Sequence, residues 1–331
     1  MVELIYDGTT ESVELKQQFT CVLGELMEQD SRVVLGDADV GFSVYGDKLT
    51  ELHDKYGDRF FDVGIQEANL VGFAAGLGLT SKIPYIVTFA PFLTRRAYDT
   101  IFISLAYAKI GAKLIGCDPG FTSAFNGGSH SALEDTGIMR CIPGITIVDI
   151  TDGTMLKSVV MDADPNKLVY IRMPRGMKLK KVYGSGTEFT YGEALLLKEG
   201  MDLTIVAAGL MVARALEASQ VLNELGIRAE VIDAFTIKPL DAELICSSAA
   251  KTGAVLCCEN HREVGGLCSA VAEALVRNGI ACSYNTVAVG DRFGEVGPAD
   301  YLSKTYGLET SDIITKAEKL VDNKKRFGGS Q

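Results

Sequence analysis

The sequence of 331 residues contains three histidines, and any imidazole chemistry must fall to one of them. His53 sits in a charged stretch, where a solvated helix face explains it. His261 ends an expected strand, the edge at which α/β sheets bind ligands, although a structural hydrogen bond would place it there equally well. His130 lies in a loop with two glycines, residues 126–131, which let the backbone approach a ligand closely. A loop histidine taken alone is more often structural, so His130 needs support from its neighbours.

Glu67 opens an expected helix over residues 66–79. A carboxylate in the first turn of a helix is favoured by the helix dipole, which is the simplest explanation for it. The apolar residues and glycines that follow indicate that this helix start is buried, and a buried carboxylate needs a partner such as a ligand nitrogen. Phe89 and Phe92 end another expected strand. Such aromatic residues usually belong to the core, but their place at the ligand edge also suits a flat ring.

Short apolar runs alternate with longer amphipathic segments along the chain, which is the pattern of βαβ units and parallel sheets. We expect strands at residues 33–35, 85–89, 113–116, 146–148, 168–171, 203–206, 229–232 and 254–256. We expect helices near residues 66–79, 93–108, 212–225, 242–251, 267–277 and 311–323. Residues 176–189 are rich in lysine and glycine and lack apolar periodicity, which is typical of a linker. The sequence thus predicts two α/β domains, residues 13–175 and residues 190–325, each with a mostly parallel sheet flanked by helices.

The composition argues against several classes of protein. A formal net charge of −11 and the lack of a long basic run disfavour nucleic acid and anionic membranes as partners. The eight cysteines include no Cys-x-x-Cys pair and accompany no histidine cluster, so we expect no metal site and a reduced, intracellular protein. The N-terminus lacks the features of a signal peptide, and the longest apolar stretch, residues 70–79, is about half the length that spans a bilayer. We therefore expect a cytoplasmic protein.

Three segments, in this order, resemble the pyrimidine-domain motifs of transketolases: residues 64–76, 88–99 and 127–135. The second half of the chain, which includes residues 259–261 and 265–267, is similar to the transketolase C-terminal domain. The resemblance extends over residues 13–325. It implies a pyrimidine-binding domain followed by a transketolase C-terminal domain, with thiamine diphosphate as the cofactor.

The resemblance also implies roles at the cofactor. Glu67 matches the glutamate that hydrogen-bonds N1′ of the aminopyrimidine, a contact that favours the tautomer able to remove the proton from thiazolium C2. Phe92 and Phe89 resemble the aromatic residues packed around the pyrimidine ring. Asp39 is expected among the cofactor-binding residues.

Further residues are implied at the substrate. His130 resembles the histidine that binds the terminal hydroxyl of the sugar donor, and with Glu67 it is expected to act in catalysis. Ser43 and Arg175 match positions that hold a sugar phosphate. Lys16 stands where the family has an arginine, which keeps the charge but loses the bidentate fork.

Two positions on the substrate side depart from the family pattern. Asn126 replaces an aspartate, and Asp118 replaces a histidine and would repel a phosphate rather than bind it. We expect both to contribute to substrate binding. The reaction, transfer of a two-carbon ketol unit from a ketose to an aldose-type acceptor, is unaffected by these changes. The substrate is then expected to be a sugar phosphate whose carbon next to the phosphate is branched or differently configured.

The phosphate-binding motifs of a complete enzyme are missing. The chain has neither a Walker sequence nor a Gly-x-Gly-x-x-Gly run, and its Gly-Asp pairs, such as residues 46–47 and 57–58, do not continue as Gly-Asp-Gly. Transketolases hold Mg²⁺ or Ca²⁺ and the diphosphate with a Gly-Asp-Gly…Asn motif in an N-terminal domain. The resemblance therefore implies the C-terminal subunit of a two-chain transketolase, active only with an N-terminal partner, in an α2β2 heterotetramer.

Other functions stay open at this point. The β-type subunit of a 2-oxo acid dehydrogenase, or a part resembling deoxyxylulose-phosphate synthase, shares the glutamate and the domain order. The first should lack the polar loop around His130, and the second normally forms one long chain. A non-catalytic assembly subunit would keep the fold alone, and the presence of Glu67, Phe92 and His130 argues against it.

Overall fold

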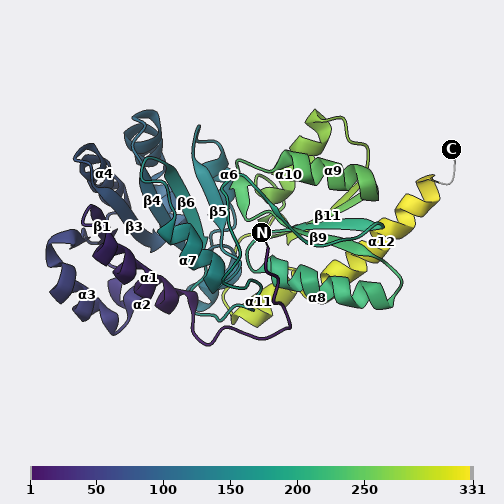
Figure 1. Cartoon of the computed structure of the whole chain (residues 1–331), viewed down its shortest axis with the longest axis horizontal. Helices are drawn as coiled ribbons and strands as arrows, with labels where there is room; N and C mark the ends of the chain where they lie inside the picture. The colour runs from purple at the N-terminus through teal and green to yellow at the C-terminus, as the bar shows by residue number, and fades with distance from the viewer. Residues whose placement is uncertain (1, 329–331) are drawn as a thin grey trace.

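A computed structural model describes residues 2–328, which form two sheets lying side by side with helices packed against them (Figure 1). The first sheet has seven strands, in the spatial order β10 (Thr236–Lys238), β5 (Thr146–Asp149), β6 (Leu168–Met173), β4 (Ala112–Cys117), β3 (Ile83–Phe89), β1 (Val33–Asp37) and β2 (Phe60–Asp62). The second has five, in the order β12 (Ser283–Val289), β11 (Ala254–Arg262), β8 (Leu203–Ala207), β9 (Ala229–Asp233) and β7 (Leu195–Lys198). Only the edge strands β10 and β7 pair antiparallel with their neighbours. The predicted fold class is confirmed.

Helices cover the two sheets. In the first half they are α1 (Leu15–Gln29), α2 (Gly41–Tyr45), α3 (Lys48–Tyr56), α4 (Glu67–Leu79), α5 (Tyr98–Thr100), α6 (Asp135–Arg140) and α7 (Gly153–Met161). In the second half they are α8 (Met211–Glu224), α9 (Ala242–Thr252), α10 (Leu267–Arg277), α11 (Ala299–Thr305) and α12 (Thr310–Gly328). Figure 1 shows α9 and α10 on one face of the second sheet and α8 and α12 on the other. Short 3₁₀ turns lie at Gly57–Arg59 and Phe121–Asn126.

The strands form where side chains are buried on both faces. Every residue of β1, β4, β5 and β6 is buried, and these strands consist largely of apolar residues. Parallel strands covered by helices on both faces have such continuous apolar runs, whereas half-exposed strands alternate. This is why the apolar runs of the sequence predicted their positions.

Several elements differ from the expectations drawn from the sequence. The segment expected to be one helix over residues 93–108 contains two π-helical stretches, Phe92–Arg96 and Ile101–Tyr107, and such turns are frequent at functional sites. Elements that were not expected are the helices α1, α2, α6, α7 and α11 and the strands β2, β7 and β12. Strand β10 lies beyond the expected linker in sequence but joins the first sheet. Because the two halves share this sheet, the expected domain boundaries stay a prediction.

A buried ion network joins the two halves. Arg172, on β6, is fully buried and donates to Asp135 Oδ2 over 2.8 Å and to the Asn260 carbonyl of β11 over 2.9 Å. It also pairs with Asp149 on β5. His261 is buried beside this network, where its Nε2 accepts the Gly137 N–H over 3.3 Å, so the described contacts of His261 are structural.

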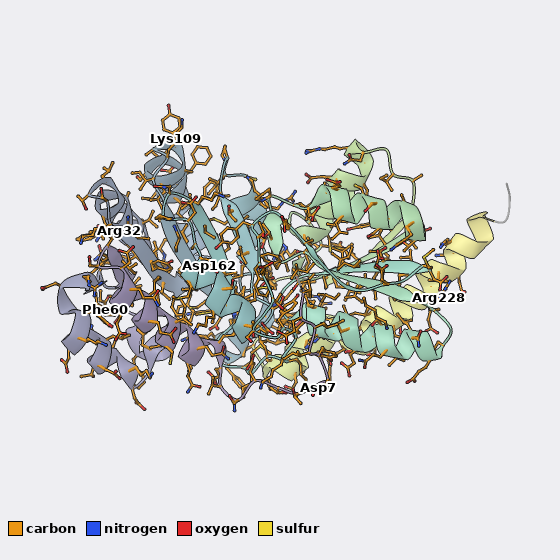
Figure 2. The ribbon with its side chains drawn as sticks, viewed as in Figure 1. Asp7, Arg32, Phe60, Lys109, Asp162 and Arg228 are labelled. Carbon is orange, nitrogen blue, oxygen red and sulfur yellow. The ribbon has the colours of Figure 1, made fainter. Side chains whose placement is uncertain are left out.

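The network predicts a large stability effect. Arg172→Met leaves two carboxylates buried without their counter-charge, so the free energy of unfolding should fall by about 3–5 kcal/mol. The matched control is Arg228→Met, since Arg228 pairs with Asp202 at the surface and is labelled in Figure 2 at the outer end of the second half. That variant should change stability by less than about 1 kcal/mol. Urea denaturation of both variants measures the difference, and equal losses would contradict a network that holds the halves together.

Candidate active site

The candidate residues gather at the carboxyl edge of the first sheet, where parallel strands bring their following loops together. Asp39 follows β1, Phe89 ends β3, Asp118 follows β4 and Arg175 follows β6. Glu67 begins α4, which follows β2. The topology thus places residues from five loops along one edge.

Aromatic rings and cations alternate in a column at this edge. The ring centroid of His130 lies 5.3 Å from that of Phe89 and 4.9 Å from that of Phe92, edge-on to both. The guanidinium carbon of Arg175 lies 4.5 Å from the centroid of Phe89, and that of Arg96 lies 4.6 Å from the centroid of Phe92. Guanidinium groups stack favourably on aromatic faces. The phenylalanines predicted to face a ligand ring therefore already contact an imidazole and two flat cations.

Glu67 is almost completely buried, as the apolar flanks of its helix indicated, with 1% of its surface exposed. Its Oε2 accepts a hydrogen bond from Arg96 Nη1 over 2.6 Å. Arg96 itself is about half exposed. The carboxylate thus has a partner that is flat, cationic and stacked on Phe92. A ligand ring that carries N–H donors fits the same pair of neighbours.

Asp118 is buried and is held by Arg175. The Asp118 carboxylate accepts from Arg175 Nε over 2.8 Å and from the Arg175 backbone N–H over 3.2 Å. Burial raises the pKa of Asp118, and the Arg175 charge opposes that rise. Asp118 was expected to repel a phosphate, and the structure adds that the Arg175 guanidinium balances its carboxylate. Asn126, in contrast, is exposed on its loop.

A second part of the site is a groove of about 1050 Å³ between α1 and α2, reaching the loop after β6. Lys16, Ser43 and Arg175 are among its lining residues. Lys16 Nζ lies 3.3 Å from Glu14, and the Ser43 hydroxyl donates to the Val40 carbonyl over 2.9 Å. Because Arg175 also stacks on the aromatic column, the anion-binding positions predicted from the sequence adjoin the ring-binding ones.

The loop that carries Asp39 is shaped by other carboxylates. Asp39 has a positive φ of 59°, an uncommon conformation for a non-glycine residue, and its N–H donates to Asp62 Oδ1 over 2.9 Å. Asp37 accepts from the Val40 N–H over 3.2 Å. Burial, with the nearby Asp62, raises the pKa of Asp37 to about 7. Sequence reasoning missed Asp37 and Asp62, although three aspartates at the ends of two strands could have indicated them.

The remaining predictions concern groups outside this edge. His53 is exposed on α3, edge-on to Phe60, as expected of a solvated helix face. Among residues 2–328, no three His, Cys, Asp or Glu side chains are grouped so that they could hold a metal ion. Nor does that part of the chain include a helix both long and apolar enough to cross a membrane.

Two family models match the chain: the transketolase pyrimidine binding domain over residues 11–178 and the transketolase C-terminal domain over residues 192–313. The chain is 40% identical to the 6-deoxy-6-sulfo-D-fructose transketolase subunit SqwH of Clostridium sp. (strain MSTE9), over 94% of this chain and 95% of that protein. It is 32% identical to a subunit of the apulose-4-phosphate transketolase of Phocaeicola vulgatus, over 93% and 98%. A 1-deoxy-D-xylulose-5-phosphate synthase of Heliobacterium modesticaldum is also 32% identical, but only 47% of its length is covered.

Solved structures agree with these relatives. A split gene transketolase, an inactive β4 tetramer, superposes with a TM-score of 0.84 at 36% identity, covering 94% of this chain and 99% of that one. The transketolase of Leishmania mexicana superposes with a TM-score of 0.78 and covers 96% of this chain but 47% of its own length. At 17% identity, that second likeness concerns the fold alone.

The pairing of Glu67 with Arg96 predicts a stability effect in the isolated chain. Arg96→Met leaves the Glu67 carboxylate without this partner, so the free energy of unfolding should fall by about 1–3 kcal/mol. The double variant Glu67→Gln/Arg96→Met should recover most of the loss, because a neutral amide costs less to bury than a carboxylate. Arg32→Met, which breaks an exposed pair with Asp30, is the control and should leave the denaturation midpoint unchanged. A double variant as unstable as Arg96→Met alone would contradict the pairing as the cause.

Proposed function

This chain belongs to the transketolase family and is a C-terminal subunit of a two-chain enzyme. We propose that it contributes the pyrimidine end of a thiamine diphosphate site and the anion-binding part of a sugar site. The predicted transferase class is confirmed by the relatives that match it along their whole length. The deoxyxylulose-phosphate synthases are more distant, and the chain spans about half of their length. The alternative based on that enzyme is therefore disfavoured.

The observation that carries the proposal is the buried carboxylate of Glu67, which is linked through Arg96 to the ring of Phe92. When bound, thiamine diphosphate supplies the carbanion chemistry that carries the two-carbon unit. Glu67 would hold a proton at N1′ of the aminopyrimidine, while Phe92 and Phe89 would pack against the ring. Asp39 would lie at the same cofactor. The buried Glu67 carboxylate would face the N–H donor of the ring as a charged acceptor, and Phe89 and Phe92 would keep water from the ring.

The substrate side has an anion-binding composition. One groove is lined by Arg175, Lys16 and Ser43. Two cationic side chains and a hydroxyl group can together bind a tetrahedral oxyanion. The named substrates of the two-chain relatives carry a sulfonate in one case and a phosphate in the other. We therefore infer a sugar with a terminal phosphate or sulfonate. His130 would bind a sugar hydroxyl, and Asp118 and Asn126 would contribute to the choice of sugar.

The chain would work with an N-terminal subunit that holds the diphosphate and its Mg²⁺ or Ca²⁺. This is supported by the family models that match the chain, those of the transketolase pyrimidine binding domain and C-terminal domain. An α2β2 heterotetramer would join two copies of each subunit. The solved split gene relative is an inactive β4 tetramer, which is consistent with a subunit of this kind lacking activity alone.

The role of Glu67 is tested by turnover of the reconstituted two-chain complex. Glu67→Gln keeps the shape of the side chain but removes the charge that favours the N1′-protonated ring, so turnover should fall by about 10²-fold or more. Glu51→Gln removes a carboxylate from the first turn of α3 and is the matched control, with turnover expected to be unchanged. Near-normal turnover in Glu67→Gln would contradict a catalytic role and indicate that Glu67 is only a favourable charge at the start of a helix.

The anionic end of the substrate is tested with matched sugars. For a ketose with a terminal phosphate or sulfonate, Lys16→Gln should raise KM about 5-fold, the effect of a partly exposed ion contact, and leave kcat nearly unchanged. For the same ketose with a terminal hydroxyl, KM should not respond. Lys55→Gln is the control, because Lys55 pairs with Glu28 away from the groove. An equal response of charged and neutral sugars to Lys16→Gln would contradict an anion-binding groove.

A further inference from the structure

The loop that carries His130 has no regular secondary structure of its own, yet it places the imidazole between two rings. Within the loop, the His130 N–H and the Ser131 N–H both donate to the Gly127 carbonyl over 3.0 Å. These short-range bonds close a turn. The residues after His130 are also attached from outside: the Ser131 hydroxyl lies 2.9 Å from the Ser123 hydroxyl, and the Gly120 and Arg262 N–H groups each donate over 2.8 Å, to the Ala132 and Leu133 carbonyls. These bonds hold the side of the loop that follows His130, so an attachment at Ser129, on the other side, is needed to fix the imidazole relative to Phe89 and Phe92.

Arg95 supplies such an attachment. Its Nη2 donates to the Ser129 carbonyl over 2.7 Å, and its Nε lies 3.4 Å from the Glu134 carboxylate. Ser129 precedes His130, and Glu134 lies at the end of the same loop, directly before α6. Arg95 itself comes from the π-helical stretch that begins at Phe92. One guanidinium thus bridges both ends of the His130 loop to the segment that carries the aromatic column.

Ser129 continues this connection to the imidazole. Its hydroxyl lies 2.9 Å from His130 Nδ1, within hydrogen-bonding distance. Which of the two donates depends on the tautomer. In either case Ser129 engages Nδ1, so Nε2 is the ring nitrogen left to meet a ligand.

The charges around His130 favour its neutral form. Burial and the charges of Arg175 and Arg95 lower the pKa of His130, while Asp118 opposes them. The other groups against the ring, Phe89 and Phe92, are uncharged. A neutral imidazole whose Nδ1 is engaged can offer Nε2 to a sugar hydroxyl without attracting the anionic end of the sugar to the wrong place.

We propose that Arg95 is a positioning residue for His130, acting through Ser129 and Glu134 so that Nε2 of the imidazole is presented to the sugar. This proposal rests on the proposed function, because it requires His130 to contact the substrate. Arg95 acts through the loop and does not itself bind the sugar. Its removal should therefore matter only while the imidazole is present.

A double-mutant cycle in the reconstituted complex tests this dependence. Arg95→Met should raise KM for the ketose donor about 10-fold with a smaller loss of kcat, and Arg95→Lys should recover part of it. His130→Ala should raise KM at least as much, and Arg95→Met/His130→Ala should be no worse than His130→Ala. The control is Arg59→Met, since Arg59 also donates to the backbone of other segments, at the Met27 and Asp30 carbonyls, but away from the site.

A pH profile adds a readout that loss of folding would not move. Removing the Arg95 charge raises the pKa of His130, so the neutral imidazole is reached only at higher pH. The acid limb of kcat/KM should therefore shift to higher pH in Arg95→Met and stay in place in Arg59→Met.

The outcomes separate the inference from the function on which it rests. Additive losses in the double variant, or an unshifted acid limb, would overturn Arg95 as a positioning residue and indicate a direct or merely structural role. A full effect of His130→Ala with normal kinetics in Arg95→Met would overturn the inference alone. Normal kinetics in His130→Ala would instead remove the proposed substrate contact of His130, and the inference with it.

Discussion

The fully buried guanidinium of Arg172 is the interaction on which the rest of the structure depends. It connects β6 to Asp149 on β5, to Asp135 at the end of the His130 loop, and to the Asn260 carbonyl of the second half. The Asn260 side chain in turn bonds to the backbone of the loop after β4. Burying an unpaired charge is costly. A movement of Arg172 away from its two carboxylates would therefore break several hydrogen bonds at once, so the network holds a single arrangement. The second half therefore supports the two loops of the site, and the shared strand β10 extends the same connection through the sheet.

Charge pairing at the site follows the same rule on a smaller scale. The carboxylates of Glu67 and Asp118 are buried, and each has its own arginine, Arg96 and Arg175. Each arginine also covers the face of a phenylalanine, so the polar and aromatic parts hold each other in place. Such an arrangement is preorganised before a ligand arrives, which reduces the ordering cost of binding. Under the proposed function, this arrangement would form the pyrimidine end and the anion end of a site whose metal-diphosphate part lies on a second chain.

The sequence predicted the central strands because a buried parallel strand has to be continuously apolar, and it predicted the helices α4, α8, α9, α10 and α12. Three short motifs indicated the family, and the family in turn indicated the candidate roles of Glu67, Phe92 and His130. It did not predict that Asp118 pairs with Arg175, because the two residues are far apart in the chain and meet only when β4 and β6 lie side by side. The π-helical turns, and the pairing of β10 with the first sheet, were missed for a related reason. Both depend on how elements pack, and neither has a periodicity that a single sequence displays.

The central claim is that this chain holds only part of the cofactor site. Isothermal titration with thiamine diphosphate and Mg²⁺ tests it most directly, first with the chain alone and then with the chain mixed with an N-terminal transketolase subunit that carries the metal-diphosphate motif. The account predicts weak binding and no ketol transfer by the chain alone, and tight binding with ketol transfer by the mixture. Tight binding of the cofactor by the chain alone would contradict it.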